Sequence, residues 1–380
     1  MSSLGSRITD EAIAALRQRL GEERPIPAPY HTEASRDAIR HFAHGIGDLN
    51  PLWQNAEYAT QTRWGGIIAP PCFLFSCGFG RSGGLPGVHG LFAGSSWTFY
   101  QPVRAGTPIH ATVRLVDLQE KTGTFAGRQI LQIDESMYRH AQTGEVLATV
   151  QNPVMRTERQ TAQERGKYAQ ITPYTWAPEE LVAIDAELAH QRPRGTTPRY
   201  WENTAVGEEL TPLLKGPLTV TDCIGWLMGW GSPFIRPHAV GFAYRQRHPA
   251  AYIPDALGIP DIPERVHWDN AFARAIGAPG AYDYGPQRVS WLGHLLSNWI
   301  GDDGWVQTLS VQVRRFNIVG DLTRCKGVVT GKRIVADQYL VDCDLWAENQ
   351  RGETTAAGTA TVLLLSRNGI AAVPGTSDRV

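Results

Sequence analysis

The 380-residue sequence predicts an α+β protein in which one unit, an antiparallel sheet packed against a long helix, occurs twice. Two observations support this prediction. Residues of the first half recur at a constant spacing in the second half, and each half places an apolar run after a proline, followed by segments of alternating apolar and polar residues. A long apolar helix is buried only when it lies against one face of such a sheet.

The internal repeat has a period of 214 residues, which separates Trp53 from His267. The same spacing relates four further pairs, namely Tyr58 and Phe272, Ala59 and Ala273, Gly66 and Gly280, and Gly106 and Gly320. Near the end of each half, residues 142–145 match residues 350–353 at a spacing of 208. So many matches in one order indicate two copies of one fold.

The repeat also fixes the domain organisation. Residues 37–39 match residues 222–224 at a spacing of 185 rather than 214, so the second copy carries 29 extra residues before His267. We therefore predict an N-terminal domain at residues 1–165, a linker at 166–198 and a C-terminal domain at 199–380 with an insertion near 233–265.

The expected elements follow in chain order. Residues 1–20 read as a charged amphipathic helix, and a short helix with Ser35 as its N-cap and Gly47 as its stop comes next. A more apolar helix begins at Pro71 in the first half and at Gly285 in the second. Antiparallel strands are expected in seven segments, at residues 97–103, 109–115, 129–133, 309–316, 327–330, 340–346 and 359–365.

Composition narrows the class of ligand and the compartment. A net charge of −1 without a dense basic run argues against a nucleic-acid partner, and no segment has the roughly 20 apolar residues of a membrane span. Five cysteines without CxxC spacing indicate neither a zinc site nor a disulfide framework, which suits a reducing compartment. We expect a cytoplasmic protein that binds a small molecule.

Three sequence runs carry a resemblance to a known family. They are GDLNPLWQNAEYA at residues 47–59, GGIIAPP at 65–71 and HWDNAFARAIGAPGAYDYG at 267–285. From about Asp37 onward the chain resembles the MaoC-like acyl dehydratases and R-specific enoyl-CoA hydratases, and its first half is similar to the fatty-acid-synthase-like dehydratase domain. The resemblance implies a double hot dog fold. It also implies a lyase of lipid metabolism that hydrates an enoyl-thioester, with coenzyme A as part of the substrate and no separate cofactor.

The resemblance points to different residues in the two halves. The family's aspartate and histidine, five positions apart, hold the water that is added. The first half keeps Asp48 and Asn50 but has Trp53 in the histidine position. The second half keeps His267, the implied general acid/base, and Gly285. The backbone N–H of Gly285 would donate a hydrogen bond to the oxyanion, at a site that the Tyr284 position helps to form. Pro71 lacks the N–H at the matching place.

The carboxylate that assists His267 is left open by the sequence. Ile262 occupies the position of the family aspartate, so Asp255, Asp261, Glu264 and Asp269 are candidates. Asp269 is favoured because it lies two residues from His267, and both would point the same way in an extended segment. A composite site of Asp48, Asn50 and His267 is a further hypothesis.

Each of these residues also has a structural interpretation. Asp48 and Asn50 are typical of a turn that ends a helix. His267 can be a buried or capping histidine, and Trp53 can be a packing residue or part of an acyl-binding wall. Arg314 and Arg315, with Lys332 and Arg333, would meet the phosphates of coenzyme A or lie as solvated charges at a sheet edge.

Two other functions fit the same fold class. One is an acyl-CoA thioesterase, and the other is a non-catalytic acyl-binding subunit of a heteromeric hydratase. A homodimer or a heteromer with another hot dog protein would be the assembly, with an acyl-thioester as the ligand.

Overall fold

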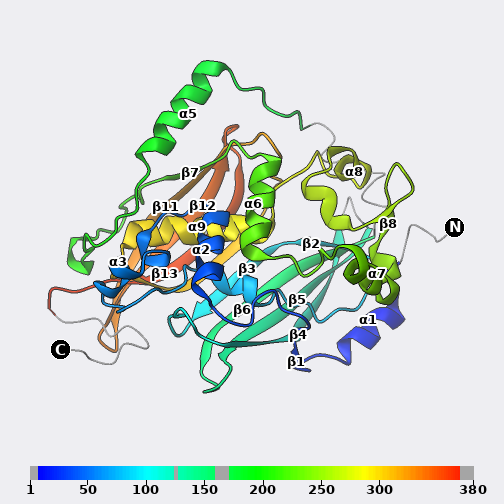
Figure 1. Ribbon diagram of the computed structural model, residues 1–380, viewed down its shortest axis with the longest axis horizontal. Coiled ribbons are helices and arrows are strands. Elements are labelled where there is room, and N and C mark those ends of the chain that lie inside the picture. The colour runs from blue at the N-terminus through cyan, green and yellow to red at the C-terminus, as the bar shows by residue number, and fades with distance from the viewer. Residues whose placement is uncertain (1–6, 124–126, 159–170, 369–380) are drawn as a thin grey trace.

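The computed structural model describes residues 7–123, 127–158 and 171–368 and contains one continuous antiparallel sheet of 11 strands (Figure 1). Their order is β1-β4-β5-β6-β3-β10-β13-β12-β11-β7, and β2 pairs with β6. The strands are β1 (Arg24–Pro25), β2 (His89–Phe92), β3 (Gly94–Phe99), β4 (Ile109–Gly123), β5 (Gly127–His140), β6 (Val146–Thr157), β7 (Leu213–Lys215), β10 (Trp305–Val313), β11 (Thr323–Val335), β12 (Gln338–Asn349) and β13 (Thr354–Leu363).

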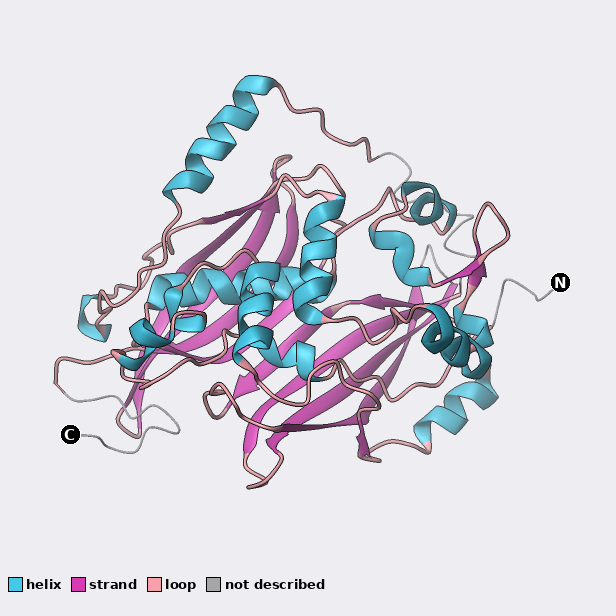
Figure 2. Cartoon of the chain, in the orientation of Figure 1, coloured by secondary structure: helices cyan, strands magenta, loops and turns pink. Residues whose placement is uncertain are grey.

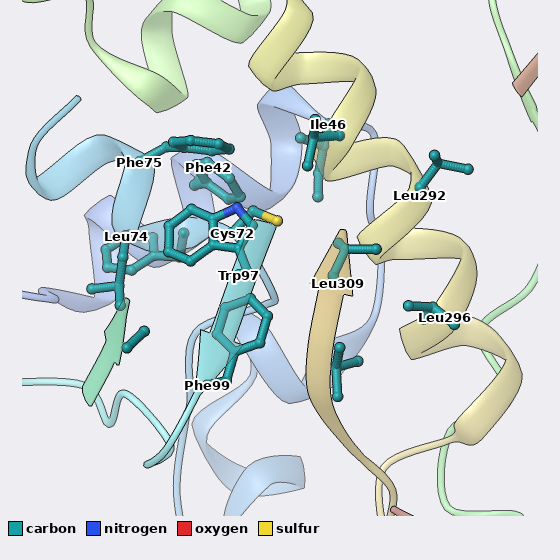
Figure 3. Close-up of a cluster of buried hydrophobic side chains, with 14 of the residues drawn as sticks. Phe42, Ile46, Cys72, Leu74, Phe75, Trp97, Phe99, Leu292, Leu296 and Leu309 are labelled. Carbon is teal, nitrogen blue, oxygen red and sulfur yellow. The ribbon is translucent and has the colours of Figure 1, made fainter. Parts of the chain in front are cut away.

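The two halves join where β3 pairs with β10. Ser96 lies directly opposite Ser310, its repeat equivalent 214 residues later, and the two hydroxyl oxygens are 2.8 Å apart. This pairing marks a pseudo-twofold axis between the copies. Figure 3 shows the core beside this junction, where Trp97 and Phe99 of β3 and Leu309 of β10 pack near Leu292 and Leu296. The predicted two sheets are thus joined edge to edge.

The long helix of the second half is α9 (Gly285–Ile300), which starts with Pro286 in its first turn and ends at Gly301. Its side chains are almost all buried, and it lies on one face of the sheet with α2 (Arg36–Gly45) and α6 (Val220–Trp230) close by (Figure 2). As predicted, the Ser35 hydroxyl caps α2 by accepting from the Ala38 N–H at 3.1 Å. α6 and α2 touch at Gly229, where a Cβ would meet the His41 carbonyl oxygen at 2.4 Å.

The first half departs from the predicted second long helix. Only a 3-10 turn, η2 (Phe73–Cys77), forms after Pro71, because Cys72 adopts a left-handed conformation (φ 68°) that cannot start a regular helix. The chain then leaves through Gly78 and Gly80, where a Cβ would come within 2.9 and 2.8 Å of the Ile26 side chain. The long-helix prediction was therefore wrong for the first half and confirmed for the second.

The remaining elements repeat between the halves or flank them. The repeat pairs η1 (Pro51–Trp53) and α3 (Ala56–Thr60) with η5 (Pro263–His267) and α8 (Asn270–Ala275). The insertion forms α7 (His238–Arg247), η4 (Pro249–Ala251) and the small hairpin of β8 (Ile253–Pro254) and β9 (Pro260–Asp261). The others are α1 (Asp10–Arg17), α5 (Pro178–His190) and η3 (Trp201–Asn203).

The segment predicted as a linker contains α5, which packs through Ile184 against Leu214 and Leu322. Residues 166–170 of that segment, and residues 159–165 before it, lie outside the described residues. Within the described part of the chain, every helix falls short of the length and apolar character that a membrane span requires.

Candidate active site

A cavity of about 900 Å³ opens at the N-terminal end of α9. Both halves contribute to it: residues 84–93 and Arg156 come from the first half, and Phe234, Tyr244, Glu264, His267 and Tyr284 come from the second. The insertion that holds α7 covers one side of it, at the right of Figure 1. Cavities of 300–1,000 Å³ are the usual size for a bound metabolite.

His267 faces this cavity at the end of η5. Its Nδ1 lies 2.8 Å from the Tyr282 carbonyl oxygen, and its ring stacks on Tyr284 with the centroids 3.7 Å apart. A carbonyl oxygen only accepts hydrogen bonds, so Nδ1 carries the proton and the lone pair of the neutral ring is on Nε2. Burial lowers the pKa of His267 to about 4, so the imidazole is neutral near pH 7. It is therefore a proton acceptor held in one tautomer.

Two carboxylates line this cavity among the described residues, and Glu264 is the one without an arginine partner, since Asp283 pairs with Arg288. Glu264 Oε2 accepts from the Ser232 hydroxyl at 2.6 Å, while Oε1 and the Tyr284 hydroxyl are both buried without a well-formed hydrogen bond and interact with each other. Burial raises the pKa of Glu264 to about 7, against a smaller lowering by Ser232. A carboxyl group that titrates near neutral pH is suited to donate a proton.

The start of α9 supplies a backbone donor. Among the residues that the structure describes, none accepts a hydrogen bond from the Gly285 N–H, which lines the cavity at the positive end of the helix dipole. Glycine is required there, because a Cβ would come within 2.2 Å of the Phe92 ring. Tyr284, the N-cap of α9, contributes its ring to the cavity wall rather than a helix cap.

Asp269, the favoured partner of His267 in the sequence, is used elsewhere. Its Oδ1 caps α8 by accepting from the Phe272 N–H at 2.9 Å, and its Oδ2 lies 3.8 Å from Arg265 Nε. It is not among the described residues that line the cavity. The extended geometry assumed for residues 267–269 does not exist, because the 3-10 helix η5 ends at His267.

Arg314 and Arg315 lie exposed at the rim of the cavity. Arg288, buried in α9, holds this segment in place by donating to the Arg315 and Thr355 carbonyl oxygens at 2.8 and 3.0 Å while pairing with Asp283. Lys332 and Arg333 do not line the cavity, since Lys332 lies over the Trp201 ring and Arg333 pairs with Asp342. Only the first pair is placed to meet a ligand that enters.

The equivalent region of the first half is closed. The Trp53 indole Nε1 donates to Asp48 Oδ2 at 2.8 Å, and the Asn50 N–H donates to Asp48 Oδ1 at 2.9 Å. The Asn50 side chain donates to Asp302 Oδ1 at 3.1 Å, and the Tyr58 hydroxyl donates to Asp302 Oδ2 at 2.5 Å. The cavity beside Trp53 is only about 50 Å³, too small for an acyl-thioester.

Asp48 is also tied to the second half. His294 Nε2 lies 3.4 Å from Asp48 Oδ1, and His294 Nδ1 lies 2.8 Å from the Lys215 ammonium. Burial lowers the pKa of Lys215 to about 8 and keeps His294 neutral, so Lys215 donates to Nδ1 and the Nε2–H faces Asp48. Burial raises the pKa of Asp48, while the hydrogen bonds from the Asn50 N–H and the Trp53 indole and the charge of Lys215 lower it. Asp48 and Lys215 are thus linked through a histidine.

His267 and Asp48 do not share one site. His267 stacks on Tyr284, whereas Asp48 contacts His294, ten residues farther along α9. Ten helical residues span about 15 Å. The composite site considered from the sequence is therefore not formed.

Comparison with known proteins places the chain in a family. The model of the FAS1-like dehydratase domain region matches residues 24–150. A UPF0336 protein from Streptomyces coelicolor is 34% identical over 144 residues, which are 36% of this chain and 91% of the relative. A solved MaoC-like dehydratase superposes with a TM-score of 0.63 at 17% identity, over 91% of this chain and 99% of that one. The chain belongs to the UPF0336 family.

A second solved structure agrees with the first on the fold of this chain. A Mycobacterium tuberculosis protein described as a double hotdog fold superposes with a TM-score of 0.55 at 9% identity, over 91% of this chain and 97% of that one. The double hot dog prediction is therefore confirmed. Among the described residues of this family member, no group of His, Cys, Asp or Glu side chains is arranged to hold a metal ion.

The sequence placed Glu264 among four candidate carboxylates without singling it out. Its position three residues before His267 differs from the family spacing of five, so the motif gave no sign of it. A usable signal was present in the repeat, because the 214-residue spacing places Glu264 opposite Asn50, the second polar residue of the first-half motif. In a 3-10 helix, residues three apart lie on the same side.

Proposed function

We propose that this protein reversibly hydrates the conjugated double bond of an enoyl-thioester, with coenzyme A as the carrier. The observation that carries the proposal is the convergence of a neutral histidine, a carboxyl group titrating near pH 7 and an unpaired helix N–H in one large cavity. The match to the FAS1-like dehydratase domain region supports the reaction class, and the cavity supports a bulky substrate.

Binding uses the two ends of the cavity differently. Arg314 and Arg315 at the rim suit the phosphates of coenzyme A, because guanidinium groups bind phosphate with charge-assisted hydrogen bonds. The thioester carbonyl then accepts from the Gly285 N–H. That bond strengthens as the carbonyl oxygen gains negative charge in the transition state, and the dipole of α9 acts in the same direction.

The proton transfers follow from the two titratable groups. His267 Nε2 takes a proton from water as the water oxygen bonds to the β-carbon, and the Glu264 carboxyl gives its proton to the α-carbon. The product is the 3-hydroxyacyl-thioester. The proton on the imidazole returns to Glu264 through solvent or Tyr284, and dehydration runs the same steps backwards. No other cofactor takes part in this scheme.

The first half serves the reaction without chemistry of its own. It closes the cavity with β2 and residues 84–88, and its own site is filled by Trp53, Asp48 and Asp302. Because the second-half cavity already contains base, acid and backbone donor, the purified chain is expected to be active alone. This argues against a purely non-catalytic acyl-binding role, whether the chain forms a homodimer or joins another hot dog protein.

The test is an assay of the purified protein with crotonyl-CoA and longer trans-2-enoyl-CoA substrates. Hydration removes the absorbance of the conjugated thioester while the thioester bond survives, and mass spectrometry finds the acyl-CoA heavier by one water. Release of free thiol, measured with a thiol reagent, would instead support a thioesterase. If neither signal appears over the whole panel, the proposal is wrong.

A further inference from the structure

Arg81 is a cation in the cavity wall that forms no salt bridge with any described residue. It follows the glycine-rich exit from η2 and lines the cavity with a partly exposed side chain. Within residues 7–123, 127–158 and 171–368, no carboxylate forms a salt bridge with its guanidinium, and its Nε is buried without a hydrogen-bond partner. The carboxylates of Asp134 and Glu264 act on Arg81 as charges but do not bind its guanidinium. A buried guanidinium without a directly bound carboxylate is costly, so this group is suited to bind the anion of a ligand.

A second guanidinium group, that of Arg156, lies close to Arg81. Arg81 NH1 and Arg156 NH1 each lie 3.2 Å from the position that a Cβ would take on Gly90, so the two guanidinium groups are close neighbours. The Phe79 ring from the first half and the Phe234 ring from the insertion lie 5.7 and 5.6 Å from the Arg81 guanidinium carbon. Two aromatic faces hold the guanidinium plane in position while its nitrogens remain free to bind an anion.

Arg81 belongs to the same cavity as the catalytic groups. Its charge acts on the Glu264 carboxyl, whose pKa it lowers. Arg314 and Arg315, by contrast, are exposed at the rim. If the rim arginines take the coenzyme A phosphates, Arg81 is left for the acyl end of the substrate.

We propose that Arg81 binds a carboxylate at the far end of the acyl group, so that the preferred substrate is the mono-thioester of an unsaturated dicarboxylic acid. The inference rests on the proposed function and narrows its substrate class. A planar guanidinium matches a carboxylate with two parallel hydrogen bonds. Water adds as before, with hydroxyl to the β-carbon and hydrogen to the α-carbon, and the remote carboxylate is unchanged by the reaction.

A bound carboxylate would also act on Glu264. It would offset the positive charge of Arg81, which in the free enzyme lowers the pKa of Glu264. The pKa of the Glu264 carboxyl would then rise further in the complex, and more of it would carry the proton that the α-carbon receives. Binding of a carboxylated substrate would thereby increase the fraction of Glu264 that is protonated and able to act as the general acid.

Kinetics on matched substrates test the inference. Glutaconyl-CoA and trans-2-pentenoyl-CoA differ only by a carboxylate in place of a methyl group, as do fumaryl-CoA and crotonyl-CoA. We expect kcat/KM of the natural protein to favour the carboxylated member of at least one pair by about 100-fold or more. Arg81→Gln should abolish that preference, and Arg81→Lys should keep part of it. Arg192→Gln, on the exposed linker surface, is the matched control.

Binding measurements separate this inference from the proposed reaction. Glutaryl-CoA and pentanoyl-CoA form the same matched pair but cannot be hydrated, and calorimetry gives their dissociation constants. Tighter binding of glutaryl-CoA that Arg81→Gln removes supports the inference even if no substrate is hydrated. Hydration of neutral enoyl-CoAs with no carboxylate preference, or a preference that survives in a folded Arg81→Gln protein, would overturn it. Circular dichroism and thermal unfolding establish that each variant is folded.

Discussion

The two halves of this chain share one backbone plan but treat the same site in opposite ways. In the first half, Trp53 donates to Asp48 and the space beside it shrinks to about 50 Å³. In the second half, His267 occupies the equivalent position, and about 900 Å³ of cavity lies before it. The stronger sequence motif is thus in the closed half. A catalytic sequence motif can be retained without catalytic activity when its polar side chains form part of a buried hydrogen-bond network.

The largest expected effect comes from exchanging the histidine that distinguishes the halves. His267→Ala should lower kcat/KM for the best enoyl-CoA by about 10³-fold, since it removes the proton acceptor. The matched change, Trp53→Phe, should cost about 1–3 kcal/mol of unfolding free energy because it leaves Asp48 Oδ2 without its donor. Its activity should stay within about threefold. Steady-state kinetics and urea unfolding measure both, and the comparison fails if Trp53→Phe is the less active variant.

A smaller effect is expected at Glu264, the acid of the open half. In the natural protein, hydration needs the protonated carboxyl, so the rate should fall as the pH rises through about 7, the pKa to which burial raises this group. Glu264→Gln should lower kcat/KM by about 10²-fold and remove that decline. The pH dependence of kcat/KM between pH 5 and about 9 is the measurement. An unchanged alkaline limb in the variant would assign the pKa to another group.

The smallest effect on activity is expected at Asp48, the motif aspartate of the closed half. Asp48→Asn should reduce the unfolding free energy by about 3 kcal/mol, because Lys215 and His294 lose the anion that they face. The remaining folded protein should hydrate substrate within about threefold of the natural rate. Differential scanning calorimetry and kinetics on the same preparation decide this. A stable but inactive Asp48→Asn protein would return the catalytic role to the first half.

The fold was largely predictable from the sequence. The 214-residue period found in Trp53 and His267 is the same spacing that sets Ser96 against Ser310 in the sheet. Strand β6 was missed, because Asn152-Pro153 in its middle reads as a turn. In the structure, Pro153 lies where β6 changes its partner from β3 to β2, a position where an interruption is tolerated.

The site was predictable only in part. His267 and Gly285 were found because each fills a family position that the first half had lost. Glu264 was not singled out, since its choice depends on Ser232 and Tyr284, which only the folded chain brings beside it. The left-handed Cys72 likewise has no sequence signal, because a non-glycine residue takes that conformation only when its surroundings impose it.

The serine pair at the centre of the sheet has a consequence for evolution. In a dimer of identical chains, every substitution appears at both sites, so a residue that improves one and fills the other cannot be selected separately. Here the two copies belong to one polypeptide and pair non-covalently at Ser96 and Ser310, and each substitution occurs once. In a single chain, one half can therefore fill its site with side chains while the other keeps a large cavity, and the two halves still pair through equivalent strands.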